Sequence, residues 1–164
     1  MISQEIPELR RYARSLCRDP DQADDLVQSS LERALKKITY WKPGSNLRAW
    51  LFTIMHNVWI NELRKQARFK TDQLDENHAG ELADRRSPEL NVSLMHDLEI
   101  GLSRLSPEHR EALLLVSMQQ FSYAEAARIC GVNVGTLMSR VHRARKQLHE
   151  TMYGGATHSL RRVK

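Results

Sequence analysis

The residues best suited to a chemical task lie near the end of the 164-residue chain, between Asn133 and His149. Four Lys or Arg side chains and no acidic ones fall between these two positions. Hydroxyl and guanidinium groups can bind base edges, and cations can bind phosphate oxygens. The stretch therefore predicts a nucleic-acid-binding helix. The alternative is an amphipathic surface helix whose arginines are simply solvated.

On a wheel of about 100° per residue, this stretch has one buried and one open face. Leu137, Val141, Ala144 and Leu148 are spaced by 4, 3 and 4 residues and form an inward stripe. The open and flanking positions, with small Gly135 among them, are expected to contact DNA: Thr136, Met138, Ser139, Arg140, His142, Arg143, Arg145 and Lys146.

The residues in front of this helix predict a helix-turn-helix. Ser122 and Glu125 form an S-x-x-E capping box that opens a short helix. Gly131 can end that helix, and Asn133 can cap the next one. A capped short helix, a tight turn and a longer basic helix make DNA binding the favoured interpretation.

A second candidate surface lies on a helix predicted from Leu47 to about Arg68. Its apolar side is formed by Leu47, Leu51, Phe52, Ile54, Met55, Val58, Trp59 and Leu63. The remaining stripe carries Trp50, Thr53, Asn57, Asn61, Arg64 and Arg68. An aromatic ring, then amides, then cations suit unstacked bases and a phosphate backbone. Taken alone, a partly buried Trp beside an ordinary polar face explains this stripe slightly better.

Catalytic and metal motifs are not found in the sequence. We find no paired carboxylates, no nucleophile with a base, no phosphate loop and no HExxH motif. Cys17 and Cys130 lie far apart and are expected to be small buried apolar residues. An enzyme is therefore the least supported class, and neither a metal nor a cofactor is expected.

The chain as a whole is expected to be all-α, because it has only 7 Gly and 5 Pro among residues that favour helices. Further helices are predicted over Glu5–Cys17, from about Asp21 to Ile38, over Leu94–Leu105, and from Pro107 behind a capping Ser106. Trp41–Asn46 is a turn-rich loop, and Ser45 or Asn46 at its end can cap the long helix.

Charge divides the chain into two basic parts and an acidic one. Residues 1–68 hold 12 basic against 8 acidic side chains, residues 69–92 hold 3 against 6, and residues 93–164 hold 10 against 6. We interpret these as two small domains (1–68 and 93–153) that each face a polyanion, a flexible acidic linker (69–92) and a basic tail (154–164). No signal peptide or spanning segment is apparent, so a cytoplasmic protein is expected.

Two sets of motifs resemble the extracytoplasmic-function (ECF, group IV) family of sigma-70 RNA polymerase sigma factors. Region 2 of that family is similar to Asp24–Gln28, Asn46–Ile54 with Asn57, and Leu63-Arg64. Region 4 is similar to Leu105–Leu113, Phe121–Ala127, Val134–Thr136, Ser139–Val141 and Arg143–Arg145. Leu9–Arg14 through Arg33–Leu35 look closest to alphaproteobacterial general-stress members.

The resemblance implies three binding surfaces and several partners. Core polymerase, at its beta-prime clamp helices, would bind Asp24, Asp25 and Gln28, and the beta flap would be a second contact. The minus-10 element would be melted and held by Trp41, Lys42, Asn46, Trp50, Asn57, Asn61, Arg64, Lys65 and Arg68. The minus-35 duplex would be read by the open face of the last helix, with Arg140 and Arg145 on the backbone. An anti-sigma factor would be the regulator.

Two positions depart from the family pattern, and two other interpretations stay open. Met138 stands where relatives often carry Lys or Arg, and Asn61 stands where they are often acidic. A stand-alone helix-turn-helix regulator would explain residues 121–148 but not the region-2 motifs. A sigma-mimicking adaptor that sequesters an anti-sigma factor would tolerate loss of the basic face, which this chain retains.

Overall fold

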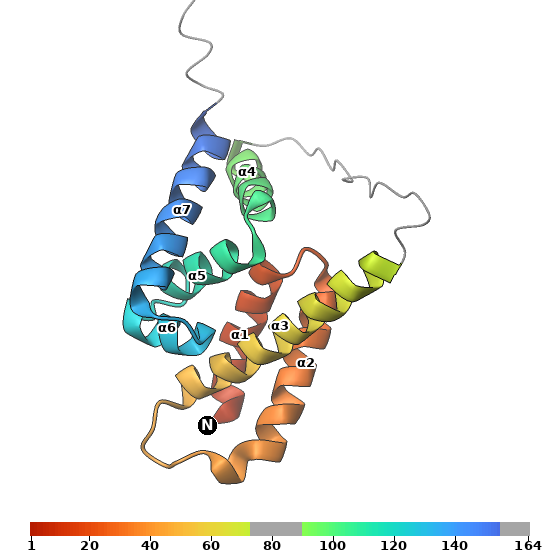
Figure 1. Cartoon of the computed structure of the whole chain (residues 1–164), viewed down its shortest axis with the longest axis vertical. Coiled ribbons are helices and arrows are strands. Elements are labelled where there is room, and N and C mark those ends of the chain that lie inside the picture. The colour runs from red at the N-terminus through yellow and green to blue at the C-terminus, as the bar shows by residue number, and fades with distance from the viewer. Residues whose placement is uncertain (73–89, 155–164) are drawn as a thin grey trace, which may run out of the picture.

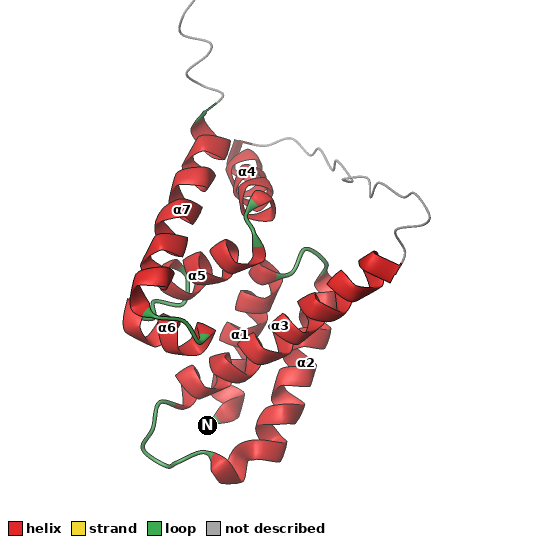
Figure 2. Cartoon of the chain, viewed as in Figure 1, coloured by secondary structure: helices red, strands yellow, loops and turns green. Residues whose placement is uncertain are grey.

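The computed structural model describes residues 1–72 and 90–154, and every regular element in these ranges is helical, as the sequence predicts (Figure 2). The elements are α1 (Ile2–Leu16), α2 (Pro20–Lys37), the 3-10 helix η1 (Ile38–Tyr40), α3 (Leu47–Asp72), α4 (Leu90–Arg104), α5 (Pro107–Ser117), α6 (Tyr123–Cys130) and α7 (Val134–Tyr153).

Helix starts follow local capping chemistry. Asp19 caps α2 by accepting a hydrogen bond from the N–H of Asp21, and Ser106 caps α5 in front of Pro107 at N1. The predicted capping box at the start of α6 is present in both directions. These side chains satisfy N–H groups that have no partner inside the helix.

Several helix ends differ from the sequence prediction. Helix α3 continues past Arg68 to Asp72, and α4 begins at Leu90 instead of Leu94. Neither extension meets a Pro or Gly, so nothing local stops the helix. Both extensions lie in the segment 69–92 interpreted as the linker, whose residues 73–89 are outside the described residues, as is the tail after residue 154.

The described helices form two bundles that pack against each other (Figure 1). In the N-terminal bundle (α1–α3), α2 packs against both α1 and α3. In the C-terminal bundle (α4–α7), α7 packs against α4, α5 and α6. Helix α3 contacts α6, and α1 contacts α5, so the two cores are continuous.

Aromatic and cationic side chains join the bundles. The ring centroids of Tyr12 and Phe52, and those of Phe52 and Phe121, lie 5.1 Å apart in edge-on pairs. The Arg48 guanidinium carbon lies 4.8 Å from the Phe121 centroid, and Arg48 donates to the Gln119 side-chain oxygen at 2.7 Å. The sequence did not predict how the bundles pack.

Candidate nucleic-acid interface

Helices α6 and α7 and the turn between them have the geometry of a helix-turn-helix. Gly131 ends α6 with a left-handed φ of 64°, which glycine adopts without steric cost. Asn133 then caps α7, accepting a 2.8 Å hydrogen bond from the N–H of Thr136. Both turn residues were predicted to have these roles, and the angle they set brings α7 against α6.

Helix α7 buries the predicted apolar stripe. Leu137, Val141 and Ala144 are buried, and the half-buried Leu148 packs against the same core. At Gly101 of α4, a side chain would overlap Leu148, so α4 packs closely on α7 there. The orientation of α7 is therefore fixed by its packing against the rest of the C-terminal bundle, α4 included.

The opposite face of α7 is open along the predicted contact residues. Exposed positions are Met138, Ser139, His142, Arg143, Arg145 and Lys146, while Thr136 and Arg140 are half-buried. Arg145 reaches back to the Ser117 hydroxyl at 3.4 Å. Among the described residues, no acidic side chain forms an ion pair with Arg143 or Lys146. This surface presents hydroxyl, imidazole and cationic groups without a competing carboxylate.

Helix α3 carries the second candidate surface. Asn57, Asn61, Arg64, Lys65 and Arg68 are exposed, and Trp50 is half-buried. The Lys65 ammonium is partly neutralised by Glu62, 2.8 Å away. The predicted order of aromatic, amide and cation is therefore present on one helix. This surface lies on a helix of the N-terminal bundle, whereas the α7 surface belongs to the C-terminal bundle.

The loop before α3 is held by hydrogen bonds at its Asn46 end. The Trp41 indole N–H is buried without a hydrogen-bond partner among the described residues, and Gly44 has a left-handed φ of 89°. Asn46 accepts from the Ala49 N–H at 3.0 Å, which caps α3, and its amide donates to Glu125 of α6 at 3.3 Å. Asn46 thus contacts the C-terminal bundle although it is exposed, as Lys42 is.

A groove of about 340 Å³ lies between α2 and α3 beside the third predicted surface. Asp25 and Gln28, exposed on α2 as is Asp24, line one side. Trp59 and Glu62 of α3 line the other. The buried indole N–H of Trp59 has no hydrogen-bond partner in the described part of the chain. The place of these two α3 residues in the groove could not be predicted from the sequence, because the groove depends on the register in which α3 packs on α2.

No helix in the described part of the chain is both long enough and apolar enough to cross a membrane.

Comparisons with known proteins agree with this arrangement. Residues 2–56 match the family model described as the Sigma2 domain of PhyR, and residues 101–148 match that described as Sigma-70, region 4. The ECF RNA polymerase sigma factor EcfG of Rhodopseudomonas palustris is 43% identical over 148 residues, 90% of this chain and 81% of that relative.

Two solved structures extend the likeness. The sigma factor RpoE of Bartonella quintana, in complex with the anti-sigma factor NepR, is 38% identical and matches over 98% of each chain with a TM-score of 0.74. The anti-anti-sigma factor PhyR from the same organism, also complexed with NepR, is 20% identical over 92% of this chain and 49% of PhyR, with a TM-score of 0.61, a likeness of fold alone. The identity and coverage shared with EcfG confirm the resemblance: the chain belongs to the ECF family of RNA polymerase sigma factors.

Proposed function

We propose that this sigma factor reads the minus-35 duplex with α7, holds the melted minus-10 strand with α3 and the preceding loop, and binds core polymerase through α2. It would act in the cytoplasm by binding alone, with no bond made or broken by its own side chains. The observation that carries the proposal is the open face of α7, whose cations have no acidic partner among the described residues.

The minus-35 role rests on the position of each side chain on α7. Ser139, His142 and Arg143 are exposed on the face opposite the buried stripe, where base edges would lie. Arg140 and Arg145 flank this face and suit phosphate contacts. Met138 is exposed at the same face and offers an apolar contact, which suits the methyl group of thymine.

The minus-10 role rests on the sequence of groups along α3. Asn57 and Asn61 are exposed and can bind unpaired base edges, while Arg64 and Arg68 continue the line with cations. Loop residues Trp41 and Lys42, with Trp50, would hold an extruded base by stacking. Stacking is worth about 1–3 kcal/mol per base, which offsets the few kcal/mol of unstacking.

Core polymerase would bind the α2 face at Asp24, Asp25 and Gln28. The adjoining groove is lined by the carboxylates of Asp25, Glu32 and Glu62 beside the side chain of Trp59. An arginine-bearing helix would complement the acidic rim. A second polymerase contact, with the beta flap, would involve the C-terminal bundle.

An anti-sigma factor is the proposed regulator. The 38% identical Bartonella sigma factor is described in complex with the anti-sigma factor NepR. We propose that this chain is held in the same way by a protein of that kind. A sigma-mimicking adaptor is the second candidate, because residues 2–56 match a domain of PhyR, an anti-anti-sigma factor.

Run-off transcription tests the proposal and separates these candidates. The full chain is added to bacterial core polymerase on a promoter library at stated salt, with no inhibitor present. We expect initiation only when the chain is present, at sites that share two spaced elements. A mimic would bind the anti-sigma factor but start no transcript, which would overturn the proposal.

Single substitutions then assign the surfaces. Arg143→Ala should relax the preferred minus-35 sequence, and Asn61→Ala should reduce open-complex formation without changing that preference. Arg10→Ala is the matched control, because Arg10 is an exposed arginine on α1 outside all three surfaces. Equal effects of the three substitutions would contradict the assignment.

A further inference from the structure

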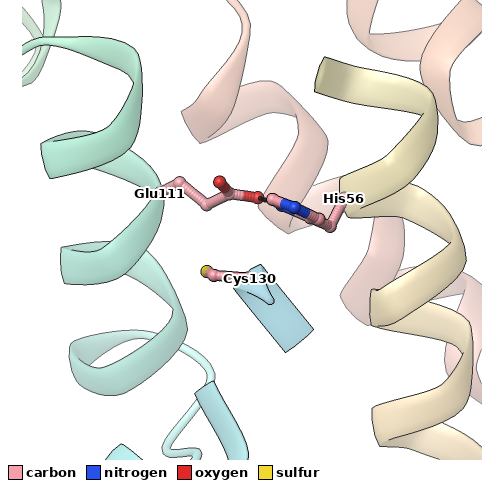
Figure 3. Close-up of side chains that lie close together, drawn as sticks. All are labelled: His56, Glu111 and Cys130. Atoms are coloured by element: carbon pink, nitrogen blue, oxygen red, sulfur yellow. Dashed lines mark hydrogen bonds and ion pairs between the residues drawn. The ribbon is translucent and has the colours of Figure 1, made fainter. Parts of the chain in front are cut away.

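Three side chains with metal-binding atoms meet where the two bundles touch. His56 comes from α3, Glu111 from α5 and Cys130 from α6 (Figure 3). Their ligand atoms all lie within 4.8 Å of one another. His56 Nδ1 is 2.7 Å from a Glu111 carboxylate oxygen, and the two side chains are only 13% and 2% exposed.

The donor set suits one kind of cation. Imidazole nitrogen, thiolate sulfur and carboxylate oxygen are the ligands that Zn²⁺ accepts in proteins, with three of them and an open fourth position in many sites. Ca²⁺ and Mg²⁺ take oxygen ligands and are disfavoured by the sulfur and nitrogen. Zinc bonds are about 2.0–2.3 Å long, so ligand atoms that lie within 4.8 Å of one another are close enough for one ion to bridge after the side chains adjust.

The cluster is largely shielded from solvent, because Glu111 and Cys130 are buried and His56 is half-buried. A divalent cation would stabilise the carboxylate and would let Cys130 bind as the thiolate, its proton going to solvent.

We propose that His56, Glu111 and Cys130 bind one Zn²⁺ between the bundles, with water at the fourth position. Because its ligands belong to α3 on one side and to α5 and α6 on the other, the ion would hold the two bundles together. Zinc would thereby favour the packed arrangement, in which Asn46 of the minus-10 surface contacts Glu125 of α6. The sequence gives no sign of this site, because the ligands are far apart along the chain.

Zinc titration of the untagged full chain against a chromophoric chelator tests the site. We expect one zinc per chain, and Co²⁺ in its place should give a thiolate-to-metal charge-transfer band. We expect Cys130→Ser and His56→Gln each to weaken zinc binding by at least about 100-fold. Loss of an outer-shell partner costs up to about that much, and these two side chains would bind the ion directly. The Co²⁺ band should vanish in Cys130→Ser.

Matched controls distinguish this site from zinc on surface histidines. Cys17 is as buried as Cys130 and His109 is half-buried on α5, so Cys17→Ser and His109→Gln should leave affinity unchanged. Glu111→Gln keeps a hydrogen-bonding partner for His56 and should fold, yet bind zinc more weakly. The proposal is overturned if Cys130→Ser and His56→Gln bind zinc as tightly as the wild type does. It is also overturned if the wild type does not bind zinc at micromolar concentration.

Thermal melting tests whether zinc holds the two bundles together. Zinc should raise the melting temperature of the wild type but not that of Cys130→Ser, because a ligand stabilises only the state that binds it. Zinc that binds at the stated residues without raising the melting temperature would overturn its role in holding the bundles together.

Discussion

Arg110 of α5 donates a 2.9 Å hydrogen bond from Nη1 to the backbone carbonyl of Leu16, the last residue of α1. The same buried guanidinium donates to the carbonyls of Leu102 at 2.7 Å and Leu105 at 3.2 Å. Burial, and second the charge of Arg18, lower the pKa of Arg110. One cation thus organises the turn between α4 and α5 and ties it to the N-terminal bundle.

Replacing Arg110 with Met should destabilise the fold strongly. Several buried carbonyls would lose their donor, and a buried acceptor without a partner costs about 1–3 kcal/mol. We expect a loss of about 3 kcal/mol in the free energy of unfolding, measured by urea denaturation. Arg104→Met, at an exposed position of α4, should change it by less than about 0.5 kcal/mol. A loss under about 1 kcal/mol for Arg110→Met would contradict this account.

The capping box of α6 should make stability depend on pH. The backbone N–H of Ser122, and second its hydroxyl, hold the pKa of Glu125 below the ordinary value of 4.5. A carboxyl whose pKa is lower in the folded state stabilises above the unfolded pKa, and this contribution is lost as pH falls through the folded pKa.

The test compares urea midpoints of wild type and Glu125→Gln between neutral pH and acid. The difference between them should be constant at neutral pH and shrink as pH falls below 4.5. Glu99→Gln, on the exposed side of α4, is the control and should follow the wild type through this range more closely. A pH-independent difference for Glu125→Gln would rule out the capping carboxylate as its source.

Helix starts were predictable because capping is local. Ser106, Ser122 and Asn133 each accept from an N–H three residues ahead, so the interaction is visible in the sequence as a residue type at a fixed spacing. The buried stripe of α7 was predictable for the same reason, since its period follows from helix geometry. The exposed face opposite that stripe could therefore be predicted before the fold, and its contact with DNA stays a prediction.

Contacts between the bundles were not predictable in this way. Arg48 looks like an ordinary basic residue of α3, yet it bonds Gln119, and Glu111 looks like a surface residue of α5, yet it is buried against His56. Both pairings depend on the angle at which the bundles dock. No periodicity within a single helix encodes that angle.

Both cysteines should resist thiol reagents in the folded chain. Burial raises the pKa of Cys17 to about 11, and burial with Glu111 raises that of Cys130 further. Since the thiolate is the reactive form, at pH about 8 we expect labelling at least about 100-fold slower than for free cysteine. Chelator-treated protein is labelled with a chromogenic disulfide, with Cys17→Ser and Cys130→Ser to assign each thiol. Fast labelling before unfolding would contradict the burial.

Two arginines on α7 should differ in how they weaken promoter binding. Arg143 lies on the exposed face of α7 that we propose reads the minus-35 bases. Arg143→Ala should therefore cost about 1–3 kcal/mol on the preferred minus-35 sequence and little on a scrambled one. Arg145→Ala should weaken both equally and reduce the slope of log affinity against log salt by about 0.9, the effect of one lost phosphate contact. Fluorescence anisotropy of the reconstituted holoenzyme on both duplexes measures the two effects, with Arg10→Ala as control. Equal losses on both sequences for Arg143→Ala would place that side chain on the backbone, because a phosphate contact carries no information about the base sequence.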